Sequence, residues 1–527
     1  MRRIISISLA ALLGTATLCL NSCSLDLKPD FTTPDYSYRT EDDVETALYG
    51  TYNALMGRYN RLYNGPIYTY LSISDEFYYR SYQPAQDVRI YSFDASEIEI
   101  QKMWAGLYQC ISRANYLIHY AGQSAPDTDE VRAMLGEAKF LRGYCYFLLV
   151  PNFGSVPMPL EPTLSPDSRH FLPQTPIAGV YAQIIKDMQE AEETVHDIDD
   201  LPTNERISKT GVQAMLARVY MSMAGKPLED TDRYADAEAY CEKVIKSGKH
   251  ELNPDYQQIF INHITGVSEP KECLWEIAAF GNNLDGTTQA GMLGIENGIA
   301  CINETVGYSG GSIRISKKLW DSFFGENDLR RDWCVAPYYY KTVPNTLDVE
   351  KTAWGADKIR ERNCGKWRRE YETGTKAKSF NATNFPVLRY SDVLLMKAEA
   401  INAQRTAPNY EALQLVNRVR RRAAGLPVET PDAGVDLPET MGGADFLAAI
   451  KTERMAELCF EGVRKTDLVR WGELVGNVKE MGKDLGTYFP NNSYKLVGEN
   501  ISERNVLFPI PVSEYSMNKN IVQNKGW

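Results

Sequence analysis

Apolar residues recur every three to four positions along most of the chain, a pattern typical of amphipathic helices. In one clear example Trp104, Leu107 and Ile111 fall on a single stripe of a helix. The same period predicts helices over residues 41–58, 101–120, 130–150, 176–194, 209–224, 233–247 and 445–472. We therefore expect an all-α protein.

Some of these helices form pairs with a shared spacing of small and large residues. In one pair Leu216, Ala217 and Tyr220 precede Tyr234, Ala237 and Val244; in another, Ala398 and Ile401 precede Tyr410, Leu413 and Val416. Small residues let the second helix approach closely, and this arrangement is loosely similar to the tetratricopeptide repeat. With helices 41–55 and 101–120 as one further pair, and 130–150 and 176–194 as another, we expect four tetratricopeptide-like pairs forming a scaffold.

The helical pattern is interrupted in two places. Residues 59–100 are loop-like and rich in aromatic residues, and residues 250–385 lack helical periodicity and include a Gly- and Asn-rich stretch at 281–311. Long loops inside a regular chain are usually functional or mobile. We expect a scaffold at 41–249 that carries a ligand-binding loop at 59–100. A loop-rich, irregular ligand-binding half (250–385) is then inserted before the last repeat pair and the C-terminal region (386–527).

The N-terminus predicts export and a lipid anchor. Arg2 and Arg3 precede an apolar stretch, which ends in Leu-Asn-Ser-Cys at residues 20–23. This ending resembles a bacterial lipobox, in which the cysteine is acylated, so we expect a lipoprotein signal peptide at 1–22, lipidation of Cys23 and a tether at 23–40. An ordinary signal peptide with an incidental cysteine is the alternative.

Composition narrows the classes of partner. The formal net charge of −12 argues against a nucleic acid, and 43% hydrophobic with 24% charged residues is ordinary globular composition. Tyrosine is abundant at 32 residues. Since tyrosine combines a flat apolar face with a hydroxyl, a tyrosine-rich surface suits amphipathic ligands such as sugars or peptides. Packing in the grooves between helices is the alternative role for these tyrosines, and it is the one that we favour.

Cysteine and histidine offer little catalytic or metal chemistry in the sequence. Only five histidines occur, and no two are near one another, so we expect no metal site and no cofactor. Four cysteines in helical surroundings are expected to be buried thiols: Cys110, Cys145, Cys241 and Cys459. Four in the irregular region leave a disulfide possible in an oxidising compartment: Cys273, Cys301, Cys334 and Cys364.

One acidic helix face invites a catalytic interpretation. Glu453, Glu457 and Glu461 are spaced to share a helical face, and two carboxylates are what a glycosidase requires. The same segment also supplies Arg454, Arg464, Asp467 and Arg470. Alternating charges at this spacing more often form a buried structural ion network, which is the interpretation that we favour.

Five groups of residues together resemble the SusD/RagB family of surface lipoproteins. They are Trp104, Tyr108, Ile111, Ala114 and Asn115; residues 136–144 with 153–157; residues 417–423; residues 453–472; and residues 507–511 with Glu514, Asn518, Asn520, Gln523 and Asn524. They occur in the family's order over nearly the whole mature chain. Lys465 and Thr466 stand where an aromatic residue often follows the arginine in the family.

The resemblance implies a non-enzymatic protein that captures glycans, or in some branches peptides, and passes them to a SusC-like TonB-dependent outer-membrane transporter. Family members present aromatic residues with polar neighbours to their glycans. We expect the equivalent site at Asp75, Tyr78, Tyr79, Tyr82, Asn282, Asn283 and Tyr308, because consecutive aromatics at 77–79 cannot all share one buried face. Trp354 and Trp367 are the next candidates.

Overall fold

The computed structural model describes residues 38–56, 62–63, 65, 73–83, 85–163, 172–281 and 289–527. Cys23, Asn282 and Asn283 lie outside these ranges, so the predictions made for them remain predictions. Within the described residues, no helix has both the length and the apolar character that a membrane span requires.

The protein is mainly α-helical, as the sequence pattern predicts. The principal helices are α2 (Glu41–Met56), α4 (Ile98–Ser124), α5 (Asp129–Phe153), α6 (Ile177–Thr194), α7 (Lys209–Ala224), α8 (Arg233–Lys246), α9 (Tyr256–Thr265), α12 (Tyr390–Ala403), α13 (Tyr410–Ala423), α14 (Gly443–Leu458), α15 (Arg464–Trp471) and α16 (Leu474–Tyr488). Shorter helices are α10 (Lys317–Ser322), α11 (Leu329–Cys334), α17 (Leu496–Asn500) and α18 (Val512–Met517).

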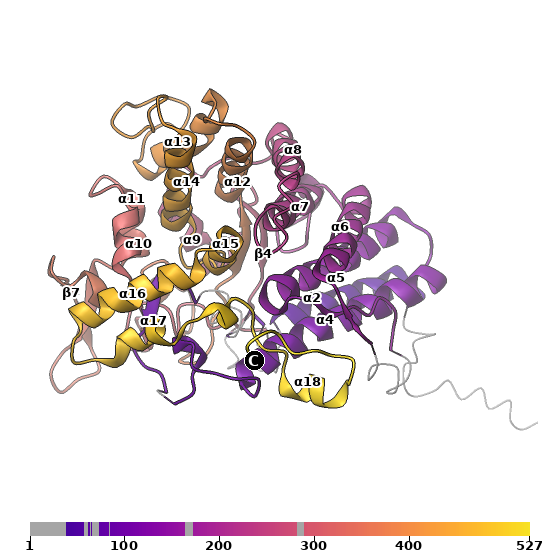
Figure 1. The fold of residues 1–527 in the computed structure, drawn as a ribbon, viewed down its shortest axis with the longest axis horizontal. Helices are drawn as coiled ribbons and strands as arrows, with labels where there is room; N and C mark the ends of the chain where they lie inside the picture. Colours follow the sequence, from indigo (N-terminus) through magenta and orange to yellow (C-terminus); the bar gives the residue numbers. More distant parts are fainter. Residues whose placement is uncertain are drawn as a thin grey trace, which may run out of the picture.

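Eight of the helices pack as consecutive pairs. The pairs α2/α4, α5/α6, α7/α8 and α12/α13 each pack together, and contacts between α4 and α5, α6 and α7, and α8 and α12 join the pairs in series. Figure 1 shows this series as an arc that runs from the indigo helices to the orange ones. That each pair is a tetratricopeptide unit stays a prediction.

Small residues explain the close packing within the arc. A Cβ atom added to Gly143 of α5 would lie 3.3 Å from the Cβ of Asp187 on α6, and one added to Gly136 would collide with Thr194. The two helices therefore approach to a distance that larger side chains would prevent. Thr128 and Ser208 cap the first turns of α5 and α7 through their hydroxyl oxygens.

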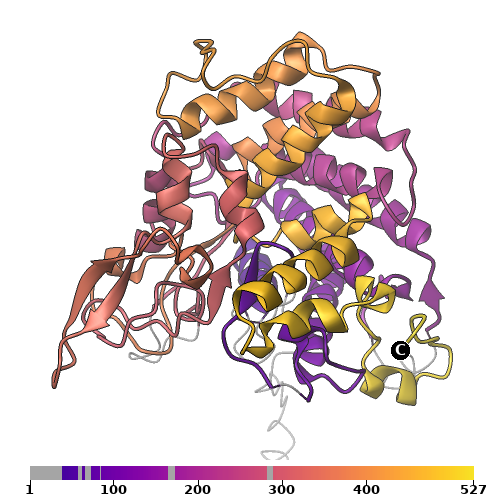
Figure 2. The same ribbon diagram turned by 60° about the vertical axis from the view of Figure 1, so that its left-hand side comes forward.

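The chain between α8 and α12 is loop-rich and contains five of the eight short strands that the described residues form, while the other three precede α8. The strands are β1 (Phe77–Tyr79), β2 (Val156–Pro157), β3 (Gln174–Thr175), β4 (Cys273–Ile277), β5 (Ile313–Ile315), β6 (Tyr338–Thr342), β7 (Val349–Ala353) and β8 (Phe385–Arg389). They pair as β1–β5, β2–β3, β4–β8 and β6–β7. β8 leads directly into α12, which ties this half to the scaffold. Figure 2 shows the β6–β7 hairpin projecting from the body.

Several predicted helix boundaries were wrong; the helix predicted over 101–120, for example, is α4 at Ile98–Ser124. The single helix expected over 445–472 is divided into α14 and α15, because Phe460 and Gly462 adopt positive φ angles of 63° and 79°. α5 continues through Pro151 to Phe153, beyond the expected end at residue 150, and stops at Gly154 with φ of 72°.

Candidate functional site

Three of the predicted ligand residues are buried by the fold. Asp75, Tyr78 and Tyr79 are 0%, 3% and 6% exposed, so they do not form a platform open to a ligand. The segment pairs with β5 as the short strand β1, whose two faces are both covered. The expectation that neighbouring aromatics must leave one ring exposed was wrong for this reason.

Each buried residue has a structural partner. Asp75 binds Arg464 through hydrogen bonds of 2.8 and 3.0 Å. The hydroxyl of Tyr78 donates to the carbonyl oxygen of Arg360 at 2.9 Å, and burial raises the pKa of Tyr78. The guanidinium of Arg89 lies 5.6 Å from the ring centre of Tyr79. These contacts join β1 to distant segments of the chain.

Tyr82 and Tyr308 are half-buried, in different surroundings. The ring of Tyr82 lies 6.5 Å from that of Tyr494, edge to face. The ammonium of Lys378 lies 4.9 Å from the ring centre of Tyr308. Of the two reserve candidates, Trp367 is 1% exposed and packs edge to face against Phe260, whereas Trp354 is half-buried.

Tyr82 belongs to a larger group of half-exposed aromatic residues, which we call the aromatic strip. The strip consists of Tyr82, Tyr339, Trp354, Tyr488, Phe489 and Tyr494. The ring centre of Tyr494 lies 5.2 Å from that of Phe489, and the ring centre of Phe489 lies 4.6 Å from that of Tyr488. Tyr339 and Trp354 form a second contact at 4.5 Å. The buried Tyr78 lies beneath the first part, 5.0 Å from Tyr494.

The loop after Trp354 joins the two parts of the strip. The hydroxyl of Tyr488 donates to the carbonyl oxygen of Asp357 at 2.7 Å. The guanidinium of Arg360 lies 4.6 Å from the ring centre of Tyr488 and is fixed by an ion pair with Asp484, with Nε 2.7 Å from Oδ2. Charged and backbone polar groups therefore stand beside the rings.

Contacts on the opposite face of the β6–β7 hairpin order the part of the chain that carries Tyr339 and Trp354. There Glu370 accepts hydrogen bonds from Tyr338 at 2.6 Å and Tyr340 at 2.8 Å, and pairs with Lys351 at 2.6 Å. Burial alone would raise the pKa of Glu370, but the hydrogen bonds from Lys351 and the two tyrosines outweigh it and lower that pKa. A rigid hairpin of this kind holds its outer rings in a fixed orientation.

Rings with polar neighbours suit the chemistry of sugars. The C–H faces of a sugar ring pack on aromatic faces, and its hydroxyls need donors and acceptors at the edge. Sequence reasoning named Tyr82 and, as a next candidate, Trp354. It missed Tyr339 on the hairpin, and it also missed Tyr488, Phe489 and Tyr494. Three aromatics within the Asn- and Pro-containing stretch 488–494 are a signal that could have identified them.

The acidic residues of the glycosidase hypothesis lie in buried ion pairs. Glu457 is 0% exposed and pairs with Arg330, Arg389 and Arg422 at 3.2, 2.8 and 2.6 Å. Burial would raise the pKa of Glu457, but the three guanidiniums together hold it far below its usual value. An ionised carboxylate enclosed by three guanidiniums has no free position for a substrate.

Glu453 and Glu461 are held in the same way. Glu453 pairs with Arg330 at 2.6 Å and with Arg420 at 3.2 Å. Glu461 lies beyond the end of α14, so it does not share the helical face that the spacing predicts, yet it pairs with Lys366 at 2.8 Å and Arg389 at 2.7 Å. No two of these carboxylates are open to a glycosidic bond.

The basic residues of this segment join α14 and α15 to other elements. Arg454 pairs with Asp467 at 2.8 Å and with Asp392 of α12 at 2.6 Å. Arg470 pairs with Asp467 at 2.9 Å and donates to Glu399 of α12 at 2.7 Å. Arg464 pairs with Asp75, far away in the sequence. The structure places all seven residues of the predicted network in buried ion pairs.

The eight cysteines within the described residues are all buried free thiols. For the four in helical surroundings this is the expected state. Cys273, Cys301, Cys334 and Cys364 form no disulfide in the structure.

Comparison with known proteins relates both halves of the chain to one family. A family model described as "SusD family" matches residues 271–527, and one described as "Starch-binding associating with outer membrane" matches residues 25–221. Together the two matches cover most of the chain.

Individual proteins resemble the chain over nearly its whole length. SusD-like protein P25 of Formosa agariphila is 24% identical over 93% of this chain and 92% of its own. The starch-binding protein SusD of Bacteroides thetaiotaomicron is 24% identical over 83% of this chain and 80% of its own. The crystal structure of a SusD homolog from Bacteroides thetaiotaomicron superimposes with a TM-score of 0.85 at 27% identity, covering 94% of this chain and 98% of that one.

Proposed function

The chain belongs to the SusD family, and from this premise we propose that it is a non-catalytic surface lipoprotein that captures glycans for uptake. The observation that carries the proposal is the aromatic strip, in which half-exposed rings stand beside the ordered polar groups of Arg360, Asp484 and the Asp357 carbonyl. This combination suits a sugar chain, whose faces are apolar and whose edges are polar.

Names of similar proteins support the choice of ligand class. One matched family model and one matched relative are described as starch-binding. We propose a glycan as the ligand of this chain on that ground together with the aromatic strip. Some branches of the family bind peptides, so the experiment below must distinguish glycan binding from peptide binding.

Binding without hydrolysis is part of the proposal. The carboxylates that would serve a glycosidase, Glu453, Glu457 and Glu461, are enclosed by arginine and lysine side chains. A general acid needs a proton and access to the glycosidic oxygen, and ion-paired buried carboxylates offer neither.

The family and the N-terminus support a proposal for the location and the partner. One matched model carries "outer membrane" in its description. We propose that Cys23 carries the lipid, that the body faces the cell exterior, and that a SusC-like TonB-dependent transporter receives the ligand. Protease accessibility on intact cells and co-purification of the transporter test these parts separately.

A binding screen with matched variants tests the proposed function. The purified mature chain is titrated calorimetrically with α-glucans, β-glucans, other polysaccharides and a peptide mixture. We expect binding to at least one glycan class, and Tyr339→Ala and Trp354→Ala should each weaken it. Tyr410→Ala is the control, because Tyr410 is 61% exposed and lies on α13, outside the strip.

Binding to peptides alone would contradict the glycan proposal. Equal glycan affinity in wild type and in both strip variants would place the site elsewhere.

A further inference from the structure

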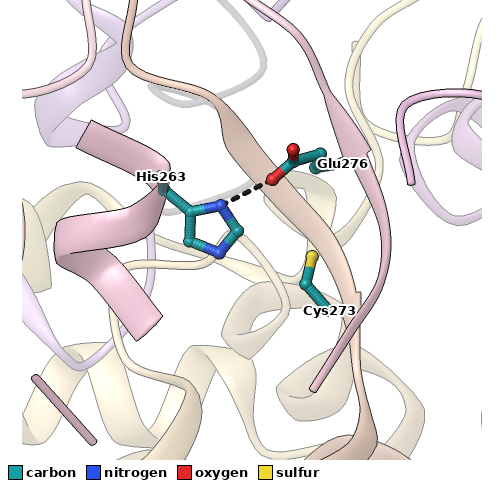
Figure 3. A group of neighbouring side chains, drawn as sticks. All are labelled: His263, Cys273 and Glu276. Carbon is teal, nitrogen blue, oxygen red and sulfur yellow. Dashed lines mark hydrogen bonds and ion pairs between the residues drawn. The ribbon is translucent and has the colours of Figure 1, made fainter. Parts of the chain in front are cut away.

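Three potential metal ligands that are separated in the sequence meet in the interior of the loop-rich half. One ligand atom from each of His263, Cys273 and Glu276 lies within 4.8 Å of the others, and the three residues are 3%, 1% and 1% exposed. Figure 3 shows His263 on α9 and the two other residues on β4, converging on one place. Among the described residues, this is the only cluster of three or more potential metal ligands.

An irregularity in β4 brings two of these residues to the same side. In a regular strand, residues three positions apart point to opposite faces. The register with β8 shifts between Cys273 and Trp275 and again between Trp275 and Glu276. Bulges of this kind re-aim side chains and are common beside functional sites.

His263 has a nitrogen without a hydrogen-bond partner. Its Nδ1 lies 2.6 Å from Oε2 of Glu276, whose other oxygen accepts from Asn384 at 2.9 Å. Its Nε2 is buried and has no partner in the described part of the chain. A buried polar atom left in this state is unfavourable, so an unmet interaction remains at this place.

The donor set has the composition of a zinc site. A thiolate, an imidazole and a carboxylate are the nitrogen, sulfur and oxygen ligands that Zn²⁺ binds, whereas Ca²⁺ and Mg²⁺ prefer oxygen ligands alone. The thiolate and the carboxylate together carry two negative charges, which a divalent cation neutralises. Neutralisation matters here because a buried thiol can lose its proton only where a nearby cation compensates the charge.

We propose that His263, Cys273 and Glu276 bind a divalent transition-metal ion of the zinc type. Tetrahedral coordination with bonds of about 2.0–2.3 Å places ligand atoms about 3.5 Å apart, so side-chain movements of roughly 1 Å complete the site. Burial raises the pKa of the Cys273 thiol. Metal binding therefore releases the thiol proton to solvent. The site ties α9 to β4 and is independent of the aromatic strip.

The test uses the mature chain with Zn²⁺ and Co²⁺ themselves as probes. After removal of loosely bound metal by chelator and dialysis, we expect about one Zn²⁺ per chain by elemental mass spectrometry. Co²⁺ should give the intense thiolate-to-metal charge-transfer absorption and the visible bands of tetrahedral coordination. Cys273→Ser should lower the affinity at least about tenfold, whereas Cys241→Ser, another buried free thiol, should leave it unchanged.

Two results would overturn the proposal. One is a folded wild-type chain that takes up neither metal at one equivalent, which would leave His263 and Glu276 as an ordinary buried hydrogen-bonded pair. The other is unchanged affinity in Cys273→Ser. If that variant does not fold, the Co²⁺ spectrum of the wild type decides, because bound Co²⁺ without thiolate absorption excludes Cys273 as a ligand.

Discussion

Asp75 and Arg464 form a buried ion pair with two hydrogen bonds of 2.8 and 3.0 Å, although 389 positions separate them in the sequence. Lys318 adds a third contact to Asp75 at 3.2 Å. Burial would raise the pKa of Asp75, but Arg464 and Lys318 together lower it. The pair fastens the segment before β1 to the start of α15, and so joins the loop at 59–100 to the C-terminal region.

Replacing Asp75 by Asn should destabilise the protein by about 3–5 kcal/mol, because it leaves the Arg464 guanidinium buried without its carboxylate. Urea unfolding followed by circular dichroism measures the change. Asp42→Asn is the control: Asp42 is exposed in the first turn of α2, and its loss should cost less than about 1 kcal/mol. Equal effects of the two changes would contradict the structural role of Asp75.

Glu457→Gln should lower the free energy of unfolding by a similar amount, about 3–5 kcal/mol, or prevent folding. The reason is that the three guanidiniums would then face a neutral amide in place of a carboxylate. The exposed Glu439→Gln serves as the control. The wild type should release no reducing sugar from any glycan that it binds. Hydrolysis that disappears in a folded Glu457→Gln or Glu461→Gln variant would refute the structural role and restore the glycosidase hypothesis.

Stability should fall in acid partly through Asp392. Burial would raise its pKa, but the guanidiniums of Arg454 and Arg218 lower it from 3.8 to about 2. A carboxyl with a lowered folded-state pKa stabilises the native state above its unfolded pKa, and this contribution disappears as the pH falls from about 4 to about 2. The shift corresponds to about 2 kcal/mol. Unfolding free energies measured across this window should decline less steeply in Asp392→Asn, which is already destabilised at pH 7.

The sequence predicts the scaffold well because the signals it uses are local. Helical periodicity and the alternating charges of 453–470 act over one or two turns, and α7 begins and ends where the pattern predicts. Burial of β1 cannot be predicted in this way. Whether Tyr78 is exposed depends on β5, Arg360 and Tyr494, which are between about 230 and 420 positions away.

The same limit applies to the candidate sites. The strip residues Tyr488, Phe489 and Tyr494 lie beside Tyr82 only in the folded chain. His263, Cys273 and Glu276 match no metal-ligand spacing, and a strand irregularity that sequence does not reveal aligns two of them. The charge network was predictable in kind, but its partners Arg330, Arg389 and Arg422 lie outside the segment that suggested it.

Lys465 should make the stability increase with pH. Lys465 is 2% exposed with Asn152 as its hydrogen-bond partner, and burial lowers its pKa from 10.5 to about 7. Between these values the unfolded chain binds a proton that the native state does not, so stability rises with pH across that window. The shift is worth roughly 5 kcal/mol. Replacing the lysine also removes its hydrogen bond to Asn152 and its contact with the ring of Phe508, whose centre lies 3.6 Å from Nζ, and this loss offsets about 2 kcal/mol of the gain.

Lys465→Met should therefore raise the stability at pH 7 by about 3 kcal/mol, with the gain shrinking towards pH 10. The exposed Lys525→Met is the control. A destabilised Lys465→Met at pH 7 would indicate that the lysine is charged and favourably bound in the native state.

Tyr78 should support the fold beneath the aromatic strip, whereas Trp354 should contact the glycan. Tyr78 is 3% exposed, its ring lies 5.0 Å from that of Tyr494, and its hydroxyl donates to Arg360. Tyr78→Ala should thus cost about 3–5 kcal/mol by opening a cavity, and Tyr78→Phe about 1 kcal/mol through the lost hydrogen bond. Glycan affinity in the folded Tyr78→Phe variant should stay within about twofold of wild type, which is about 0.4 kcal/mol.

Trp354 should behave in the opposite way, because it is half-buried and packs against Tyr339 on a hairpin that Glu370 already orders. Trp354→Ala should lower glycan affinity by about fivefold or more, the equivalent of about 1 kcal/mol for one stacked ring, while urea unfolding shows a smaller loss than for Tyr78→Ala. If Tyr78→Ala instead abolishes binding at unchanged stability, Tyr78 contacts the ligand and β1 must be open to it. Weakened binding in Trp354→Ala together with wild-type affinity in Tyr78→Phe would locate the sugar on the outer rings and leave Tyr78 as their support.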